Sequence, residues 1–270
     1  MRLITSIPPR FSRKDPRTGE EVGLAYLARC VESWRRNGFE PVSVNRPDEA
    51  ETVSTMGLIE VWSADQSEAK LPDKYGPCLG SIFDLLASDE PVAIINADIF
   101  MPLHKEISRA LAAVLENRIV AARRTDVKSI DDGAEAGSIY PYGYDFFAFK
   151  PGNVPRAIKN PAVRSFQLGA PWWDYVFPIY CAAEIPACRL TEPFILHQLH
   201  DERWDIPLHQ RLAVDACATL ADLHECFEPL RSRRDERLAD DVSALCHEVL
   251  FWPGFYELDL MMGGVRTQVA

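Results

Sequence analysis

The stretch from Pro91 to Phe100 constrains the fold of this 270-residue chain more than any other. Four consecutive apolar residues, Val92 to Ile95, run into Asn96 and Asp98 with no charge before the carboxylate. A short apolar run that follows a proline predicts a buried strand of a parallel sheet. Ligands of open α/β sheets bind beyond the carboxyl ends of strands, so Asp98 is expected where a carboxylate can hold a metal ion or a sugar phosphate. The alternative is that Asp98 caps a helix beginning near Pro102.

Strand-like and helix-like patterns alternate on both sides of this run. Between Gly23 and Asn37, the apolar residues Leu24, Leu27 and Val31 recur at steps of three and four, which predicts a helix. Strands are also expected over residues 2–7, 41–45, 59–62, 118–122 and near 147–149, and helices over residues 78–87 and 103–116. This alternation predicts an α/β fold with a mostly parallel central sheet flanked by helices. Residues 125–138 are polar and acidic, and are expected to form a loop over a site.

The composition restricts the classes of protein to which the chain can belong. Its net charge of −11 and its pI near 5.1 argue against a nucleic-acid partner. Seven cysteines without a C-x-x-C pair predict reduced thiols and a cytoplasmic protein. No apolar run approaches the roughly 18 residues that a membrane-spanning helix needs, so any contact with a membrane is expected to be peripheral.

Common nucleotide-binding and hydrolase motifs do not occur in the chain. There is no G-x-x-x-x-G-K-[ST] phosphate loop, no G-x-G-x-x-G after the first strand and no G-x-S-x-G. What remains is Asp98, the aromatic cluster around Asp174, and the pair of His197 and His200. A carboxylate and an imidazole that both lie at strand ends suit Mn²⁺ or Mg²⁺ bound together with a diphosphate.

The two histidines admit more than one interpretation. Alternation along a strand that starts at Phe194 puts His197 and His200 on opposite faces, so one imidazole at most is expected in a common site. His200 is the first choice because it adjoins the polar residues 201–203. A zinc site of His197, His200 and His209 is an alternative, although its spacing matches no standard pattern.

In the order of these features the chain resembles the GT-A fold of nucleotide-sugar-dependent glycosyltransferases, over about residues 1–205. In that family a buried strand ends in a D-x-D motif, which binds the metal and the nucleotide sugar. Asn96-Ala97-Asp98 stands at that place, with an amide in place of the first acid. The resemblance implies that Asp98 contacts a divalent metal, that Asn96 contacts the ribose, and that His200 or His197 completes the metal site. It further implies donor contacts from Thr5, Ser6, Ile7 and Asn45.

Trp172 and Trp173 precede Asp174, and together they indicate an acceptor site. Aromatic faces stack on sugar rings, and a carboxylate near the acceptor hydroxyl acts as the general base of an inverting transferase. Burial beside two indoles would raise the pKa of Asp174 towards that task. Tyr144 and Asp145 are expected to add contacts to the acceptor. The alternative places both indoles in the core and makes Asp174 a helix cap.

The sequence therefore predicts a glycosyltransferase that moves a sugar from a nucleoside diphosphate to a hydroxyl of a glycan or another acceptor. A divalent metal, or basic side chains such as Lys70, Lys74 and Arg123, would stabilise the departing diphosphate. Residues 206–270 are expected to form a helical extension packed on a catalytic domain of residues 1–205.

Two alternative functions are open at this point. A sugar nucleotidyltransferase would use the same sheet, but the glycine- and Arg/Lys-rich loop usual after its first strand is missing, since Ile7 to Phe11 contains no glycine. A catalytically retired protein would only bind glycans or a partner, and loss of the first acid of the D-x-D motif is one route to that state.

Overall fold

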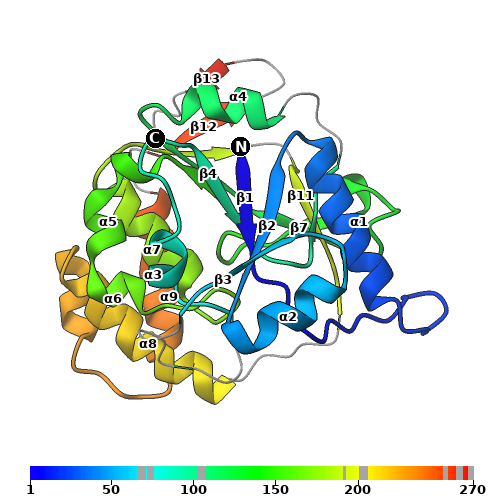
Figure 1. The fold of residues 1–270 in the computed structure, drawn as a ribbon. Helices are drawn as coiled ribbons and strands as arrows, with labels where there is room; N and C mark the ends of the chain where they lie inside the picture. The colour runs from blue at the N-terminus through cyan, green and yellow to red at the C-terminus, as the bar shows by residue number, and fades with distance from the viewer. Residues whose placement is uncertain are drawn as a thin grey trace.

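The computed structural model describes residues 1–65, 71, 76–102, 107–190, 193–200, 206–251, 255–259 and 264–266. Within them, nine strands form a central sheet in the order β13-β12-β10-β6-β9-β4-β1-β2-β3 (Figure 1). Its strands are β1 (Arg2–Thr5), β2 (Glu40–Asn45), β3 (Glu60–Ser63), β4 (Val92–Ile95), β6 (Ile119–Ala122), β9 (Phe146–Phe149), β10 (Ala187–Leu190), β12 (Phe255–Asp259) and β13 (Gly264–Arg266). Antiparallel pairing is confined to β9 with β4 and β6 and to β13 with β12. The predicted, mostly parallel central sheet is confirmed.

A smaller sheet continues from the end of β4 and has the strand order β5-β11-β7-β8. Its strands are β5 (Ile99–Phe100), β7 (Arg124–Val127), β8 (Ser138–Ile139) and β11 (Ile195–Gln198). The expectation of a loop over residues 125–138 is therefore wrong at its start. Thr125 and Val127 are buried while Asp126 between them is half-buried, which is the alternation of a strand with one face against the core.

Helices cover both faces of the central sheet (Figure 1). They are α1 (Gly23–Arg36), α2 (Pro47–Thr55), α3 (Leu79–Phe83), α4 (Ile107–Val114), α5 (Pro155–Lys159), α6 (Pro161–Arg164), α7 (Trp173–Ala182), α8 (Ile206–Ala221) and α9 (Leu238–Phe251), with 3-10 turns η1 (Ala134–Ala136), η2 (Pro151–Asn153) and η3 (Glu225–Leu230). Successive strand residues point to opposite faces and so to two separate cores. Ile94 belongs to the core that includes residues of α3 and α7 to α9, whereas Ile95 belongs to the core that includes residues of α1 and α4.

The helix predicted from residue 23 is α1, and Asn37 follows its last residue as the cap. Leu27, Val31 and Trp34 are buried against the sheet, as their spacing indicates. Leu24 is 56% exposed, because it lies in the first turn at the edge of a buried stripe that is centred on Leu27, Cys30 and Trp34.

The C-terminal region contains strands as well as helices. α8 and α9 contribute to the same core as α7. β12 pairs with β10 and β13 pairs with β12, so the region expected to be a purely helical extension also widens the central sheet. No helix in the described part of the chain is long and apolar enough to cross a membrane.

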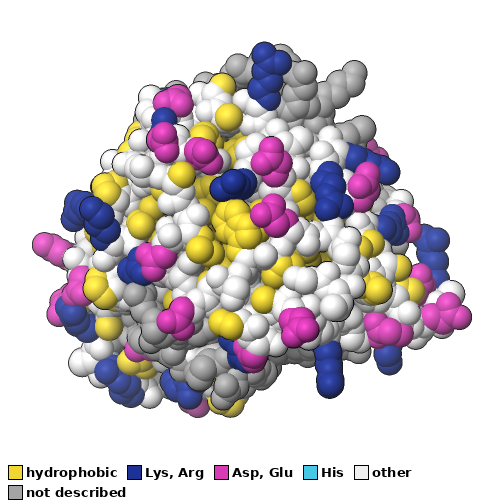
Figure 2. Space-filling view, viewed as in Figure 1, with side chains coloured by type: hydrophobic (Ala, Val, Ile, Leu, Met, Phe, Trp, Pro, Cys, Tyr) yellow, Lys and Arg dark blue, Asp and Glu magenta, His cyan; other side chains and the backbone are white. Residues whose placement is uncertain are grey.

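The surface mixes charges of both signs. On the face seen in Figure 2, Lys and Arg side chains are interspersed with Asp and Glu, and the coloured residues form no continuous basic patch. A polyanion such as nucleic acid would need such a patch. That the chain binds no nucleic acid stays a prediction.

Candidate functional site

Asp98 lies in the turn that joins the central sheet to the smaller one. β1 and β4 are parallel, with Ile4 beside Ile94, so the residues that follow both strands meet at the carboxyl edge of the sheet. The backbone carbonyl of Asp98 accepts a hydrogen bond from the Tyr26 hydroxyl at 2.9 Å, which ties this turn to α1. Asp98 thus lies just beyond a buried strand, as predicted.

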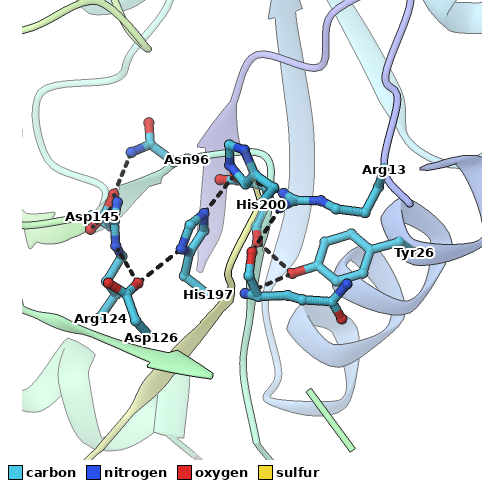
Figure 3. A network of polar contacts seen from close by, with 10 residues as sticks. Arg13, Tyr26, Asn96, Arg124, Asp126, Asp145, His197 and His200 are labelled. Atoms are coloured by element: carbon cyan, nitrogen blue, oxygen red, sulfur yellow. Dashed lines mark hydrogen bonds and ion pairs between the residues drawn. The ribbon is translucent and has the colours of Figure 1, made fainter. Parts of the chain in front are cut away.

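Two histidines face the Asp98 carboxylate (Figure 3). Nε2 of His197 lies 3.2 Å from Asp98 Oδ2, and Nε2 of His200 lies 3.6 Å from the same oxygen. The expectation that the two imidazoles lie on opposite faces is wrong, because β11 ends at Gln198 and strand alternation stops before His200. His197 is buried, whereas the His200 side chain is 33% exposed.

These three side chains fit a divalent cation. One ion binds nitrogen and oxygen ligands at about 2.0–2.2 Å, which places neighbouring ligand atoms about 3.0–3.4 Å apart. The distances of 3.2 and 3.6 Å from Asp98 Oδ2 to the two Nε2 atoms are close to this spacing. All three ligand atoms lie within 4.8 Å of one another. Two imidazoles beside a carboxylate suit Mn²⁺ better than Mg²⁺, which prefers oxygen ligands and water.

Arg13 reaches the same carboxylate from the loop between β1 and α1 (Figure 3). Its Nη2 donates to Asp98 Oδ2 at 2.9 Å and its Nη1 donates to the Gln198 carbonyl at 2.8 Å. The guanidinium lies 4.7 Å from the centre of the Tyr26 ring, and Arg13 is only 4% exposed. Sequence reasoning missed this residue, because it stands in a polar segment and its partners are 85 and 185 residues away.

The charges around Asp98 set the pKa values of the site. Burial alone would raise the pKa of Asp98, but His197, His200 and Arg13 more than offset it and hold that pKa well below its usual range. Burial alone would lower the pKa of His197. The carboxylates of Asp98 and Asp126 outweigh this effect, and the pKa of His197 is raised as a result.

A chain of polar contacts runs from His197 to Asn96 (Figure 3). Nδ1 of His197 lies 2.9 Å from Asp126 Oδ1, which also accepts a hydrogen bond from Arg124 Nε at 2.9 Å. Arg124 Nη1 reaches Asp145 Oδ1 at 3.3 Å, and Asn96 Nδ2 donates to that oxygen at 2.6 Å. The site is therefore continuous with a buried network of carboxylates and guanidinium groups.

This network gives a physical reason for the asparagine at position 96. Its amide donates a hydrogen bond to Asp145, whereas an ionised aspartate would have no hydrogen to donate and would bring two like charges together. Asp145 is 5% exposed, so that repulsion would be poorly screened by water. Asp145 therefore disfavours an acid at position 96, where the D-x-D motif would have its first aspartate.

The residues expected to contact a donor lie at the same edge of the sheet but are mostly buried. Thr5 and Ile7 are fully buried, and Ser6 is half-buried. Asn45 is also fully buried: its Nδ2 donates to the Ile7 carbonyl at 2.8 Å and its Oδ1 accepts from the Ser43 hydroxyl at 2.6 Å. Asn45 and Ile7 therefore fix the loop after β1, and direct contact of their side chains with a ligand does not fit this burial.

Asp174 lies in the first turn of α7, against the backbone of Gly143. Gly143 has φ of +75°, and a Cβ there would collide with the Asp174 carboxylate, so only glycine allows this approach. Burial raises the pKa of Asp174 to about 7; the Asp145 carboxylate adds to the rise, and Arg124 and the Tyr144 N–H oppose it. The predicted rise in pKa is confirmed, and the role of Asp174 as a base stays a prediction.

Trp172 and Trp173 belong to the core and are each 2% exposed. Trp172 Nε1 donates to the His209 carbonyl at 2.9 Å. The indole of Trp172 also stacks on the imidazole of His209, with 4.8 Å between the ring centres. The expectation that these indoles stack on a sugar is wrong, because Trp173 in the first turn of α7 and Trp172 at its N-cap are both buried. Tyr144 and Asp145, at 2% and 5% exposure, are likewise too buried to contact an acceptor directly.

The other candidate ligands lie apart from Asp98 or beyond the described residues. His209 belongs to α8 and is not in the group of Asp98, His197 and His200, so the three-histidine zinc site is wrong. Arg123 is half-buried beside Tyr144, and this burial lowers its pKa. Lys70 and Lys74 lie outside the residues that the structure describes.

Comparison with known proteins finds no relative by sequence. No family model matches the chain, and no curated protein matches it. In structure the chain is similar to 4-diphosphocytidyl-2C-methyl-D-erythritol synthase from Anaerococcus prevotii, with a TM-score of 0.40 and 14% identity over 70% of this chain and 86% of that one.

Two further solved structures are similar at the same level. Mannose-1-phosphate geranyltransferase from Thermus thermophilus has a TM-score of 0.31 and 15% identity, covering 67% of this chain and 62% of that one. HddC from Yersinia pseudotuberculosis has a TM-score of 0.35 and 9% identity, covering 59% and 79%. Similarity this weak carries no argument about function, which must come from the site.

Proposed function

We propose that this chain is a divalent-cation-dependent glycosyltransferase, which moves a sugar from a nucleoside diphosphate to an acceptor hydroxyl. The observation that carries the proposal is the convergence of Asp98, His197 and His200 at the carboxyl edge of a mostly parallel sheet. Open α/β sheets bind their ligands at that edge. A divalent cation bound there supplies positive charge to the diphosphate as it departs.

Arg13 is the positive charge that we assign to the diphosphate, and its burial means that it would act on that group electrostatically and not by direct contact. Its guanidinium lies 2.9 Å from the Asp98 carboxylate and its side chain is 3% exposed, whereas the side chains of Asp98 and His200 are 25% and 33% exposed. The Nε atom of Arg13 is buried and has no hydrogen-bond partner among the described residues.

Asp174 is the group that we assign to the acceptor. In an inverting reaction the acceptor oxygen attacks the anomeric carbon, the bond from that carbon to the diphosphate breaks, and the carboxylate takes the hydroxyl proton. A pKa of about 7 lets Asp174 hold that proton near neutral pH and release it afterwards. Tyr142, which is 55% exposed and precedes Gly143 in the same loop, offers the accessible aromatic face that the buried tryptophans do not.

A sugar nucleotidyltransferase is the second candidate, and Arg13 is the observation that favours it. The sequence has no glycine- and Arg/Lys-rich loop directly after the first strand. The loop after β1 nevertheless brings Arg13 to the Asp98 carboxylate, so a cationic side chain from that loop does reach the carboxyl edge of the sheet. The two reactions have different products and are separated by identifying them.

The test begins with thermal unfolding of the full chain against a panel of nucleoside diphosphates and sugar nucleotides, with and without Mn²⁺. A ligand at about a hundredfold excess over its Kd stabilises the native state by about 2.7 kcal/mol. We expect a Mn²⁺-dependent rise in the melting temperature with one sugar nucleotide, lost in Asp98→Ala and kept in Asp131→Ala. Asp131 serves as the control because its side chain is 55% exposed and pairs with Arg29.

Product analysis with the nucleotide so identified then decides the reaction. Release of a nucleoside diphosphate with a new glycoside supports glycosyl transfer, whereas release of pyrophosphate from a nucleoside triphosphate and a sugar phosphate supports nucleotidyl transfer. A stabilisation that does not depend on metal would leave Arg13 as the main cation for the diphosphate. No stabilisation by any nucleotide would refute the donor site and favour a glycan-binding protein.

A further inference from the structure

Each ring nitrogen of His197 lies beside the carboxylate of an aspartate. Its Nε2 lies 3.2 Å from Asp98 Oδ2, and its Nδ1 lies 2.9 Å from Asp126 Oδ1. The second contact follows from the sheet itself, because β11 and β7 are parallel and their register places His197 directly beside Asp126. Paired residues of neighbouring strands point to the same face, so this contact does not depend on a chance side-chain conformation.

Asp126 is itself held in place by Arg124. Arg124 Nε donates to the same Oδ1 atom at 2.9 Å, and Arg124 Nη1 lies 3.3 Å from Asp145 Oδ1. The guanidinium of Arg124 is 3.9 Å from the centre of the Tyr140 ring, which restricts it on a further side. The side chains of Arg124 and Asp126 are 17% and 14% exposed, so water competes little for these contacts.

We propose that Asp126 is a positioning residue for the cation centre: it accepts the Nδ1–H of His197 and so directs Nε2 towards Asp98. An imidazole that donates through one nitrogen presents the lone pair of the other to a metal, and an anionic acceptor strengthens that lone pair. His200 lies beyond the end of β11 and its side chain is 33% exposed. His197 is therefore the metal ligand whose ring orientation the sheet fixes in advance. The inference rests on the proposed cation centre and needs no particular transferred group.

The experiment measures Mn²⁺ binding by the purified full chain without nucleotide, using calorimetry and the electron paramagnetic resonance of free Mn²⁺. We expect Asp126→Ala to raise the Kd for Mn²⁺ about 10- to 100-fold. Asp126→Asn keeps an oxygen that can accept from His197 and loses only the charge, so its rise in Kd should be smaller. Asp131→Ala removes a carboxylate that is 55% exposed and should leave the Kd within about twofold.

A second readout separates positioning from general damage to the fold. Co²⁺ in place of Mn²⁺ gives an absorption spectrum that reports ligand geometry, and we expect Asp126→Ala to change its band positions and intensities at saturating Co²⁺. Unfolding of the apo variants with urea shows whether each is folded. Wild-type Kd values and Co²⁺ spectra in folded Asp126→Ala and Asp126→Asn would overturn the positioning role.

His197→Ala and Asp98→Ala show which idea has failed. If both lose Mn²⁺ while the Asp126 variants bind it as wild type does, the cation centre stands and the role of Asp126 is refuted. If neither changes the Kd, the cation centre itself is refuted, and the proposed function falls with it. If nucleotide sugars are not turned over but the Asp126 variants weaken Mn²⁺ binding, the inference holds and only the transferase is lost.

Discussion

Asp174→Asn should change how the stability of this fold depends on pH. Burial raises the pKa of Asp174 from 3.8 to about 7 in the folded protein, while the unfolded chain keeps the ordinary value. Between these two values the folded state binds more protons than the unfolded state, so this group makes stability fall as the pH rises through the window. The asparagine side chain has nearly the same shape and no charge, so the variant lacks this fall.

The size of the effect follows from the shift. Moving the pKa from 3.8 to about 7 corresponds to roughly 4 kcal/mol when the pH is above both values. About 2–3 kcal/mol of this develops between about pH 5 and pH 8, and the remainder lies below pH 5. The unfolding free energy of Asp174→Asn minus that of wild type should therefore increase by about 2–3 kcal/mol as the pH rises from 5 to 8, which means that the variant gains stability relative to wild type.

Urea denaturation at pH 5, 6, 7 and 8, followed by tryptophan fluorescence and circular dichroism, measures this difference. Subtracting the variant from the wild type removes the contributions of other titrating groups. Asp89→Asn changes the charge by the same amount at an exposed position and is the control. Parallel stability curves for Asp174→Asn and wild type from pH 5 to 8 would refute the claim that burial keeps this carboxyl protonated, and with it the argument for Asp174 as a base.

Three further changes test the surroundings of the site. Arg13→Gln removes a positive charge 2.9 Å from Asp98 Oδ2, so calorimetry should show tighter Mn²⁺ binding by several-fold and weaker nucleoside diphosphate binding. Asn96→Asp loses the hydrogen bond donated to Asp145 and adds a like charge beside it, so urea denaturation should show a loss of about 1–3 kcal/mol with no gain in Mn²⁺ affinity. Trp173→Ala should lower the unfolding free energy by about 3–5 kcal/mol, since the indole is 2% exposed. A variant of wild-type stability whose only defect is a raised KM for the acceptor would contradict this core role.

The elements that were predictable from sequence are those whose burial is decided locally. The continuous apolar run of β4 indicates a strand that is buried on both faces. The spacing of Leu27, Val31 and Trp34 indicates a helix that is buried on one face, so both elements could be recognised without knowing what packs against them. The same local logic placed Asp98 at the end of a buried strand. It also predicted a raised pKa for Asp174, because burial is the largest cause of that shift.

The features that were not predictable depend on partners far along the chain or on where an element stops. Arg13 is one of many arginines in polar segments until the fold brings it to Asp98. His200 joins His197 only because β11 ends between them, and strand boundaries are the least reliable part of a sequence-based assignment. Trp172 shows a third limit, since an indole looks the same in a sequence whether it lines a site or, as here, fills the core at 2% exposure.

The permanent charges of the network are consistent with the proposed cation centre. Asp98, Asp126 and Asp145 contribute three carboxylates, and Arg13 and Arg124 contribute two guanidinium groups, so these described side chains carry one more permanent negative charge than positive charge. A buried surplus charge is costly unless another charge compensates for it. Because Arg124 lies between Asp126 and Asp145, the compensation is needed beside Asp98, where Arg13 is permanently positive and His197, whose pKa is raised, supplies a second positive charge when it is protonated; a bound cation would take the place of that proton. A divalent ion at that point would turn the surplus of negative charge into a surplus of positive charge, and a diphosphate would then be the natural counter-ion. The opposite effects expected for Arg13→Gln and Asp126→Ala on Mn²⁺ affinity follow from this balance, and loss of packing alone would weaken binding in both variants.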